Sequence, residues 1–385
     1  MNEDPRPPLA LYVHVPFCLQ RCHYCDFAVT RSAEPPVSEW IACLGQDLLQ
    51  WREELGGPGQ HRVDTIFIGG GTPSLLGGAG MESLAGLLAR HFDWDAGRLE
   101  WTVEANPGSL TADAARRWRD LGVNRLSIGV QSFDDGALHW LGRLHDSAGA
   151  TSAIERAREA GFENVSVDLI FGLPTDVPRS WGDDLKRAVS LGVTHVSAYG
   201  LTAEPRTPLG KMVANGRVRM PDEGVYADEY SETVNILSMY DFKQYEVSNF
   251  ALAGYECRHN WHYWIGSEYL GLGPSAHSHV GGRRIWNVTQ WQAYRDAARS
   301  GASVREGYEI PTRADRRLES LWLGLRTRRG IDVAAHGIEA DLVSHWVAEG
   351  WASISDGILR LTPGGWLRMD GLVAELDSRL AKIGA

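Results

Sequence analysis

The sequence predicts an α/β fold, in which a partial parallel (β/α) barrel is followed by a small C-terminal winged-helix-like α+β domain. Three observations support this prediction. Short strand-like runs alternate with segments long enough for helices, polar or glycine-rich stretches come directly after these runs, and the pattern changes after about residue 290. We therefore expect a barrel domain over residues 1–290 and a second domain over residues 291–385.

Six predicted strands form the first part of this pattern. They cover Leu11–Val15, Thr65–Ile68, Trp101–Val103, Arg125–Val130, Asn164–Phe171 and His195–Tyr199. Helical spacing of apolar residues is found at Val37–Leu55, Met81–Phe92, Thr111–Leu121, Ser147–Ala160, Trp181–Leu191 and Asp222–Met239. The strands are apolar at nearly every position, which is typical of strands that are buried on both faces of a parallel sheet.

The number of these units favours a partial barrel. A closed barrel needs eight strands, and only Gln244–Val247 offers a seventh. An open doubly wound sheet is the alternative fold.

The C-terminal part differs from the rest of the chain. Tyr308–Gly330 has a helical, arginine-rich pattern, and a helix, a β-wing and a second helix are expected at Leu342–Gly350, Ile354–Leu361 and Gly364–Leu380. This order is typical of winged-helix domains, many of which bind nucleic acid. The formal net charge of −11 argues against that role, because no basic stripe is available to replace counterions on a phosphate backbone. We expect no nucleic-acid partner.

The composition limits the class of protein further. Apolar residues make up 43% and charged residues 23% of the chain, and no apolar run approaches the ~18 residues of a membrane helix. The N-terminal residues lack the basic and apolar regions of a signal peptide, so we expect a cytoplasmic protein. Thiols stay reduced in that compartment, and the five cysteines therefore indicate metal binding rather than disulfides.

Three of these cysteines form the strongest chemical signal. Cys18, Cys22 and Cys25 lie within eight residues, directly after the first predicted strand. Three soft ligands in one loop can hold an iron–sulfur cluster. A zinc site completed by His14 or His23 is the alternative, because zinc also accepts three cysteines and one histidine.

Polar and glycine-rich residues also follow each of the other predicted strands. They form the stretches Gly69–Ser74, Glu104–Pro107, Gln131–Asp134, Asp168–Pro174 and Gly200–Pro205. Parallel α/β folds build their sites at the carboxyl ends of the strands. We therefore expect these loops and the cysteine loop to form one composite site.

The C-x3-C-x2-C spacing of the cysteines, on the exit loop of the first strand, resembles the radical S-adenosylmethionine (SAM) superfamily. The resemblance implies a partial barrel of radical SAM type and a [4Fe–4S] cluster held by Cys18, Cys22 and Cys25. It also implies that SAM chelates the fourth iron, and that an electron from the reduced cluster can cleave SAM to a 5′-deoxyadenosyl radical.

The same resemblance implies a set of SAM contacts. Gly69–Ser74 resembles the glycine motif of the superfamily, in which main-chain groups meet the methionyl end of SAM. Carboxylates suit the ribose hydroxyls, and an arginine suits the carboxylate of SAM. The implied SAM-binding residues are Tyr12, Tyr24, Gly70, Gly71, Thr72, Glu104, Gln131, Arg143, Asp168 and Gly200.

Four phrases resemble one group of the superfamily, which contains oxygen-independent coproporphyrinogen III oxidase and the HemW-type heme chaperones. These phrases are Leu11–Cys18, Gly69–Ser74, Ser127–Phe133 and Asp168–Pro174. Three features favour the chaperones. Phe27 stands where the oxidases have a further cysteine, the first strand begins at Leu11 without their long N-terminal arm, and His259–Trp264 resembles the HNxxYW signature of the chaperones.

The resemblance therefore implies a heme chaperone, which binds heme and delivers it to target hemoproteins while carrying the cluster and SAM. Candidate recipients are hemoproteins such as those of the respiratory chain, and peripheral contact with a membrane stays open. The competing hypotheses, both linked to radical SAM chemistry, are oxidative decarboxylation of coproporphyrinogen III in porphyrin metabolism and a reaction on an unrelated small molecule.

His259 is the candidate heme ligand in this interpretation. Its imidazole could bind the iron while Tyr263 and Trp264 pack on the macrocycle. A buried histidine that anchors a loop is the alternative interpretation. The rival ligands are His262, His277, His279 and Cys257.

Overall fold

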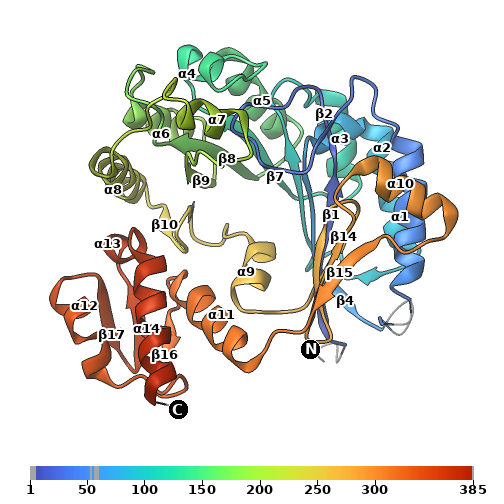
Figure 1. The fold of residues 1–385 in the computed structure, drawn as a ribbon. Coiled ribbons are helices and arrows are strands. Elements are labelled where there is room, and N and C mark those ends of the chain that lie inside the picture. The colour runs from blue at the N-terminus through green and yellow to red at the C-terminus, as the bar shows by residue number, and fades with distance from the viewer. Residues whose placement is uncertain (1–5, 53, 56–59, 384–385) are drawn as a thin grey trace.

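The computed structural model describes residues 6–52, 54–55 and 60–383. Its main body is a strongly curved sheet that is covered by helices on its outer side (Figure 1). Six parallel strands lie next to one another in the order β1, β4, β6, β7, β8 and β9. They cover Pro8–Val15, Arg62–Gly70, Glu100–Ala105, Arg125–Gln131, Asn164–Phe171 and His195–Gly200. The predicted partial parallel barrel is confirmed.

Helices follow these strands and cover the outside of the sheet. Helices α1 to α8 cover Val37–Gln50, Gly77–Ala89, Ala112–Asp120, Asp135–Trp140, Ser147–Glu159, Trp181–Ser190, Pro208–Ala214 and Glu223–Met239, and a 3-10 helix covers Pro73–Leu76. Several begin at a side chain that accepts a hydrogen bond from the first turn. Thr111 accepts from the Ala114 N–H group and Asp146 from the Gly149 N–H group. The starts of these helices are therefore encoded locally.

The central strands alternate between an apolar outer face and a polar inner face. On β1, Leu11 and Val13 pack into the core under the helices, whereas Tyr12 faces the inside of the barrel. On β7, Leu126 joins the outer core and Ser127 faces inward. The interior of the barrel is therefore polar, and this places chemically active groups inside the fold.

The sheet continues on both sides of the predicted strands. Beyond β1, strand β12 runs parallel to it and an antiparallel extension follows, while beyond β9 two short antiparallel strands form the other edge. The additional strands β10 to β15 cover Lys243–Gln244, Asn249–Ala251, Tyr269–Leu272, His277–Val280, Arg283–Asn287 and Arg305–Glu309. Three further strands, β2, β3 and β5, cover Phe17–Cys18, Thr30–Arg31 and Asp93–Trp94, and helices α9 and α10 cover Arg258–Trp264 and Trp291–Ser300.

The predicted seventh strand at Gln244–Val247 is wrong. Only its first residue lies in a strand, and the chain turns before Asn249 to form the short pair β10 and β11. Glu246, within the turn, is fully buried and forms an ion pair with Arg326 at 2.8 Å. This ion pair joins two distant segments, so the turn depends on a contact that a local pattern does not contain.

The C-terminal part forms the expected small winged-helix-like α+β unit. Its strands pair in the order β16, β18, β17 and cover Ile331–Asp332, Ile358–Leu361 and Ala352–Ser355. Its helices α11 to α14 cover Arg313–Leu325, Ser344–Ala348, Pro363–Trp366 and Met369–Ile383, and a 3-10 helix covers Ala340–Val343. The domain boundary expected after residue 290 stays a prediction. Strand β15, beyond it, still pairs with β14 of the main sheet.

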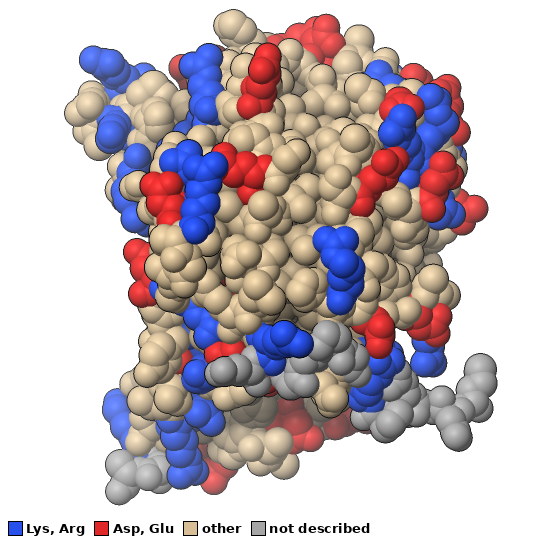
Figure 2. Space-filling view, turned by 90° about the vertical axis from the view of Figure 1, so that its right-hand side faces the viewer, with Lys and Arg blue, Asp and Glu red and all other residues tan. Residues whose placement is uncertain are grey.

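Charged side chains are scattered over the face of the molecule that Figure 2 shows. The face that carries α1 and α10 shows small, intermixed groups of acidic and basic residues with wide uncharged areas between them, and no continuous basic stripe (Figure 2). No helix in the described residues is long and apolar enough to cross a membrane.

A buried carboxylate joins α1 to the extension of the sheet. Asp47 on α1 is fully buried, and its Oδ2 accepts hydrogen bonds from three donors. These are the Gly273 N–H at 3.0 Å, the Asn287 side-chain amide at 2.9 Å and the Tyr294 hydroxyl at 2.8 Å. Asp47 thus joins the helical layer to the sheet extension, and Gln50 at the end of the same helix adds hydrogen bonds to Ala302 and Val304.

We predict that Asp47→Ala lowers the free energy of unfolding by about 3 kcal/mol, because three buried donors lose their acceptor. The exposed Asp120→Ala should change it by no more than about 0.5 kcal/mol. Urea denaturation of both variants measures the difference. Equal stabilities would show that Asp47 does not tie these elements together.

Candidate functional site

The cysteine loop begins at the carboxyl end of β1 and is closed at its base. Strands β2 and β3 pair there, and the Ser32 N–H donates to the Cys18 carbonyl at 2.9 Å. Within the loop, the Cys25 N–H donates to the Cys22 carbonyl at 3.2 Å, and the Arg21 guanidinium donates to the Cys25 carbonyl. The loop is therefore held in a defined shape by its own main chain.

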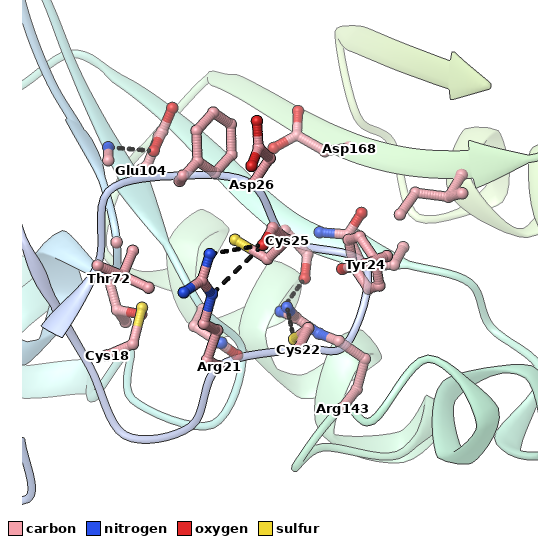
Figure 3. A pocket seen from close by; sticks show the side chains of 18 of the residues that line it. Cys18, Arg21, Cys22, Tyr24, Cys25, Asp26, Thr72, Glu104, Arg143 and Asp168 are labelled. Carbon is pink, nitrogen blue, oxygen red and sulfur yellow. Dashed lines mark hydrogen bonds between the residues drawn. The ribbon is translucent and has the colours of Figure 1, made fainter. Parts of the chain in front are cut away.

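All three cysteine side chains line one cavity of about 460 Å³. The Cys18 Sγ lies 3.2 Å from the Thr72 Oγ1, and the Cys22 Sγ lies 3.5 Å from the Arg143 Nη1 (Figure 3). Burial raises the pKa of the Cys18 and Cys25 thiols. In the described part of the chain no three His, Cys, Asp or Glu side chains come close enough together to hold one metal ion. The three thiols therefore line the walls of a cavity and do not converge on one metal-ion position.

The glycine loop after β4 lies directly against the cysteine loop. A Cβ atom on Gly71 would lie 2.6 Å from the Phe17 carbonyl oxygen and 3.0 Å from the Cys18 Sγ. Gly70 has a φ of 110°, which L side chains rarely adopt, and its N–H donates to Glu104 at 3.0 Å. The two loops can approach each other only because these residues have no side chain.

Two half-buried carboxylates form the inner wall of the cavity. In Figure 3, Glu104 and Asp168 lie above the cysteines. Burial, together with the nearby Asp168, raises the pKa of Glu104 to about 8. Burial also raises the pKa of Asp168, which accepts hydrogen bonds from Ser197 and Ser127. A ligand with several donor groups would satisfy these oxygens.

Arg143 lies on the opposite side of the cysteines (Figure 3). Its Nη2 donates to the Gly129 carbonyl at 2.9 Å, while its Nε is buried and has no hydrogen-bond partner within the described residues. Gln131 lies nearby with a φ of 70°, a backbone conformation that is uncommon outside glycine and often occurs at functional sites. This side of the cavity therefore offers donors for an anionic group.

Most of the predicted site residues line this one cavity. They are Cys18, Cys22, Tyr24, Cys25, Gly70, Gly71, Thr72, Glu104, Gln131, Arg143, Asp168 and Gly200. Tyr12 does not line it, because it points into the barrel below, where its hydroxyl bonds the His14 Nδ1 at 3.0 Å. Sequence analysis did not name Tyr199 and Asp26 as site residues, and it included Asn106 only as part of the Glu104–Pro107 loop. Tyr199 and Asn106 lie near strand ends, and this position could have identified them.

The chain is similar in sequence to a series of curated proteins. The model of the radical SAM superfamily matches residues 12–188. The heme chaperone HemW of Bacillus subtilis is 38% identical over 83% of this chain and 84% of its own length. The heme chaperone HemW of Mycobacterium tuberculosis H37Rv is 35% identical over 97% of this chain and 95% of its own. The chain belongs to the HemW family. This confirms the family that the cysteine spacing and the HNxxYW segment predict.

A solved structure also shares the fold of this HemW-family chain. Coproporphyrinogen III oxidase (HemN) of Escherichia coli superposes with a TM-score of 0.81 and covers 98% of this chain and 91% of its own. The two sequences are 23% identical, so the likeness shows a common fold and no more.

The HNxxYW segment of this family member does not line the cysteine cavity and lies on α9 at the open side of the barrel (Figure 1). His259 is 1% exposed. Its Nδ1 bonds the Thr65 hydroxyl at 2.8 Å and its Nε2 bonds the Tyr263 hydroxyl at 2.8 Å. Both ring nitrogens therefore form hydrogen bonds in this arrangement, and the role of His259 as a heme ligand stays a prediction. The alternative interpretation, a buried histidine that anchors its segment, fits the geometry.

We predict that Gly71→Ala moves the cysteine loop, because the new methyl group would meet the Phe17 carbonyl and the Cys18 sulfur. The melting temperature and the iron retained after anaerobic reconstitution should both fall. Gly86→Ala, on the outer helix α2, is the control. It should leave the iron content unchanged and should not lower the melting temperature, because alanine is favoured over glycine in helices and the site has room for a methyl group. Normal iron retention in Gly71→Ala would show that the two loops need no such close fit.

Proposed function

We propose that this protein is a heme chaperone that binds heme and delivers it to target hemoproteins, and that it carries a [4Fe–4S] cluster and SAM in the cysteine cavity. The observation that carries this proposal is the 35% identity to a curated heme chaperone over 97% of the chain. The arrangement of the cysteine cavity supports the second part.

The donor set of the cavity fits an iron–sulfur cluster better than a zinc ion. A [4Fe–4S] cluster binds each thiolate through a different iron, so its three cysteines surround a space, as they do here. Zinc would need a compact fourth ligand. His14 bonds the Tyr12 hydroxyl and the Ala28 carbonyl with its two nitrogens, and His23 does not line the cavity.

The remaining residues of the cavity fit SAM. The unpartnered Nε of Arg143 and the nearby guanidinium nitrogens suit its carboxylate. Glu104 and Asp168 suit the ribose hydroxyls and positive groups, and the bare main chain of the glycine loop admits its methionyl end. A cluster bound by Cys18, Cys22 and Cys25 would supply an iron without a protein ligand and one reducing electron.

We also propose that the protein is cytoplasmic and that its recipients are hemoproteins such as those of the respiratory chain. Phe27, which distinguishes this chain from the oxidases in sequence, lines the cysteine cavity and is 66% exposed. An exposed aromatic ring at this position offers no thiol for chemistry, and we propose no coproporphyrinogen III oxidation.

We predict about four irons and four sulfides per chain after anaerobic purification. Replacing Cys18, Cys22 or Cys25 with alanine should remove most of the iron. Cys43→Ala is the control, because Cys43 packs in the core on α1 and should not be needed. Stoichiometric zinc with little iron in the unaltered protein would contradict the cluster assignment.

We predict that the reconstituted protein binds heme at about one per chain and does not convert coproporphyrinogen III in the presence of SAM and a reductant. The Soret band reports heme binding, and chromatography of the porphyrins reports turnover. The cluster-free Cys22→Ala variant gives the background rate. Turnover well above that rate would show that the protein is an oxidase. Absence of heme binding would contradict the proposed chaperone function.

A further inference from the structure

A second cavity, of about 660 Å³, lies between the barrel and the C-terminal unit. Its walls come from α9, the antiparallel extension of the sheet, α11 and the segment around β16. Its volume is within the range of sites for cofactors, about 300–1,000 Å³. The residues that matter for its chemistry are Tyr263, Trp264, Tyr269, His279, Arg316, Arg329 and His336.

The two histidines of this cavity differ in how many hydrogen bonds their ring nitrogens form. Both ring nitrogens of His336 form hydrogen bonds. The Nε2 bonds the Ser320 hydroxyl at 2.9 Å, and the Nδ1 bonds the Asp332 carbonyl at 2.9 Å. His279 makes one long bond, from Nδ1 to the Ser267 carbonyl at 3.4 Å. A carbonyl acceptor fixes the proton on Nδ1 and leaves a lone pair on Nε2. Metal-binding histidines commonly have this arrangement.

Aromatic rings connect His279 to the HNxxYW segment. The Tyr269 ring lies 6.2 Å from the His279 ring, and the Tyr263 and Tyr269 rings pack edge to face at 4.7 Å. Trp264 lines the same cavity. A planar, largely apolar macrocycle packs well against such a wall.

Arg316 and Arg329 give the cavity two cationic groups that form no ion pair with a carboxylate in the described part of the chain. The Arg316 Nε donates to the Pro311 carbonyl, and the Arg329 guanidinium lies 3.9 Å above the Trp261 ring. Arg284, by contrast, is held by Glu309 and Glu319. Arginines of this kind suit the carboxylates of heme propionates.

We propose that this interdomain cavity is the heme site, with the His279 Nε2 as axial ligand and with Arg316 and Arg329 as partners of the propionates. The proposal rests on the proposed function, since it names where the cargo binds. It also gives His259 a different role. The His259 Nε2 holds the Tyr263 hydroxyl, so His259 positions the aromatic wall and does not touch the iron.

The test is a titration of the full-length protein with ferric heme, followed by the Soret band. His279→Ala should shift the band and weaken binding at least about tenfold, a change of ~1.4 kcal/mol. The matched control His336→Ala should keep the band position, because both its nitrogens are already bonded. His259→Ala should weaken binding and keep the band position, as expected of a positioning residue. Added imidazole should restore the band in His279→Ala.

A second experiment tests Arg316 and Arg329 as partners of the propionates and leaves the proposed iron ligand His279 unchanged. Heme dimethyl ester has no propionate carboxylates, so the unaltered protein should bind it more weakly than heme. The double variant Arg316→Gln/Arg329→Gln should bind heme and the ester with the same, weaker affinity. Circular dichroism checks that each variant is folded.

The outcomes separate the two proposals. If the unaltered protein binds heme, but His279→Ala leaves the band and the affinity unchanged, the site is overturned and the chaperone function stands. A band shift in His259→Ala that matches loss of an axial ligand would likewise overturn the site. If the unaltered protein binds no heme, the proposed function itself fails.

Discussion

Strand β6 connects the two ends of the molecule through a pair of glutamates on one face. Glu104, at its carboxyl end, accepts the Gly70 N–H of the glycine loop. Glu100, at its first position, accepts the N–H groups of Arg258 and His259 at the first turn of α9. Side chains four residues apart on a strand point to the same side. The position of α9 and the shape of the glycine loop thus depend on one strand of the barrel.

Carboxylates inside a protein are costly unless opposite charge lies near them, and the charge of Arg125 opposes the rise in the pKa of Glu104 and Asp168. Arg125 is 2% exposed, and an internal cavity of about 200 Å³ joins it to Glu104, Asp168, His259 and Tyr263. Tyr263 also lines the interdomain cavity, and Glu104 also lines the cysteine cavity. The polar interior is therefore a continuous set of side chains between the two proposed sites.

The sequence predicts the cysteine cavity well because its information is local. Many lining residues lie at or just after the carboxyl end of a strand, and parallel strands carry those ends to one rim. The period of two along β1 directs Tyr12 into the barrel below the rim, and its contact with SAM stays a prediction. The near-continuous apolar runs concealed this alternation, because inward-facing positions such as Phe67 and Tyr199 are themselves aromatic.

The parts that sequence reasoning did not reach depend on contacts between distant segments. The extension from β12 to β15 is built on Asp47, which lies on α1 more than two hundred residues earlier. The histidine of the HNxxYW segment was interpreted as a ligand from its aromatic neighbours, yet its partners, Thr65 and Glu100, come from two different strands. The interdomain cavity exists only where α11 meets the sheet, so no motif encodes it.

The division of the proposed heme site between two units bears on how a chaperone could release its cargo. His279 belongs to the main sheet, whereas Arg316 and Arg329 belong to the C-terminal part, which is joined to its own last helix by the Arg317–Asp377 pair at 2.8 Å. In the proposed site, the iron ligand and the propionate partners would therefore come from different units of the chain. Three ion pairs, Arg284–Glu319, Arg326–Glu246 and Arg328–Glu256, also join these units. Any movement of one unit against the other would have to break these contacts as well as those to the propionates.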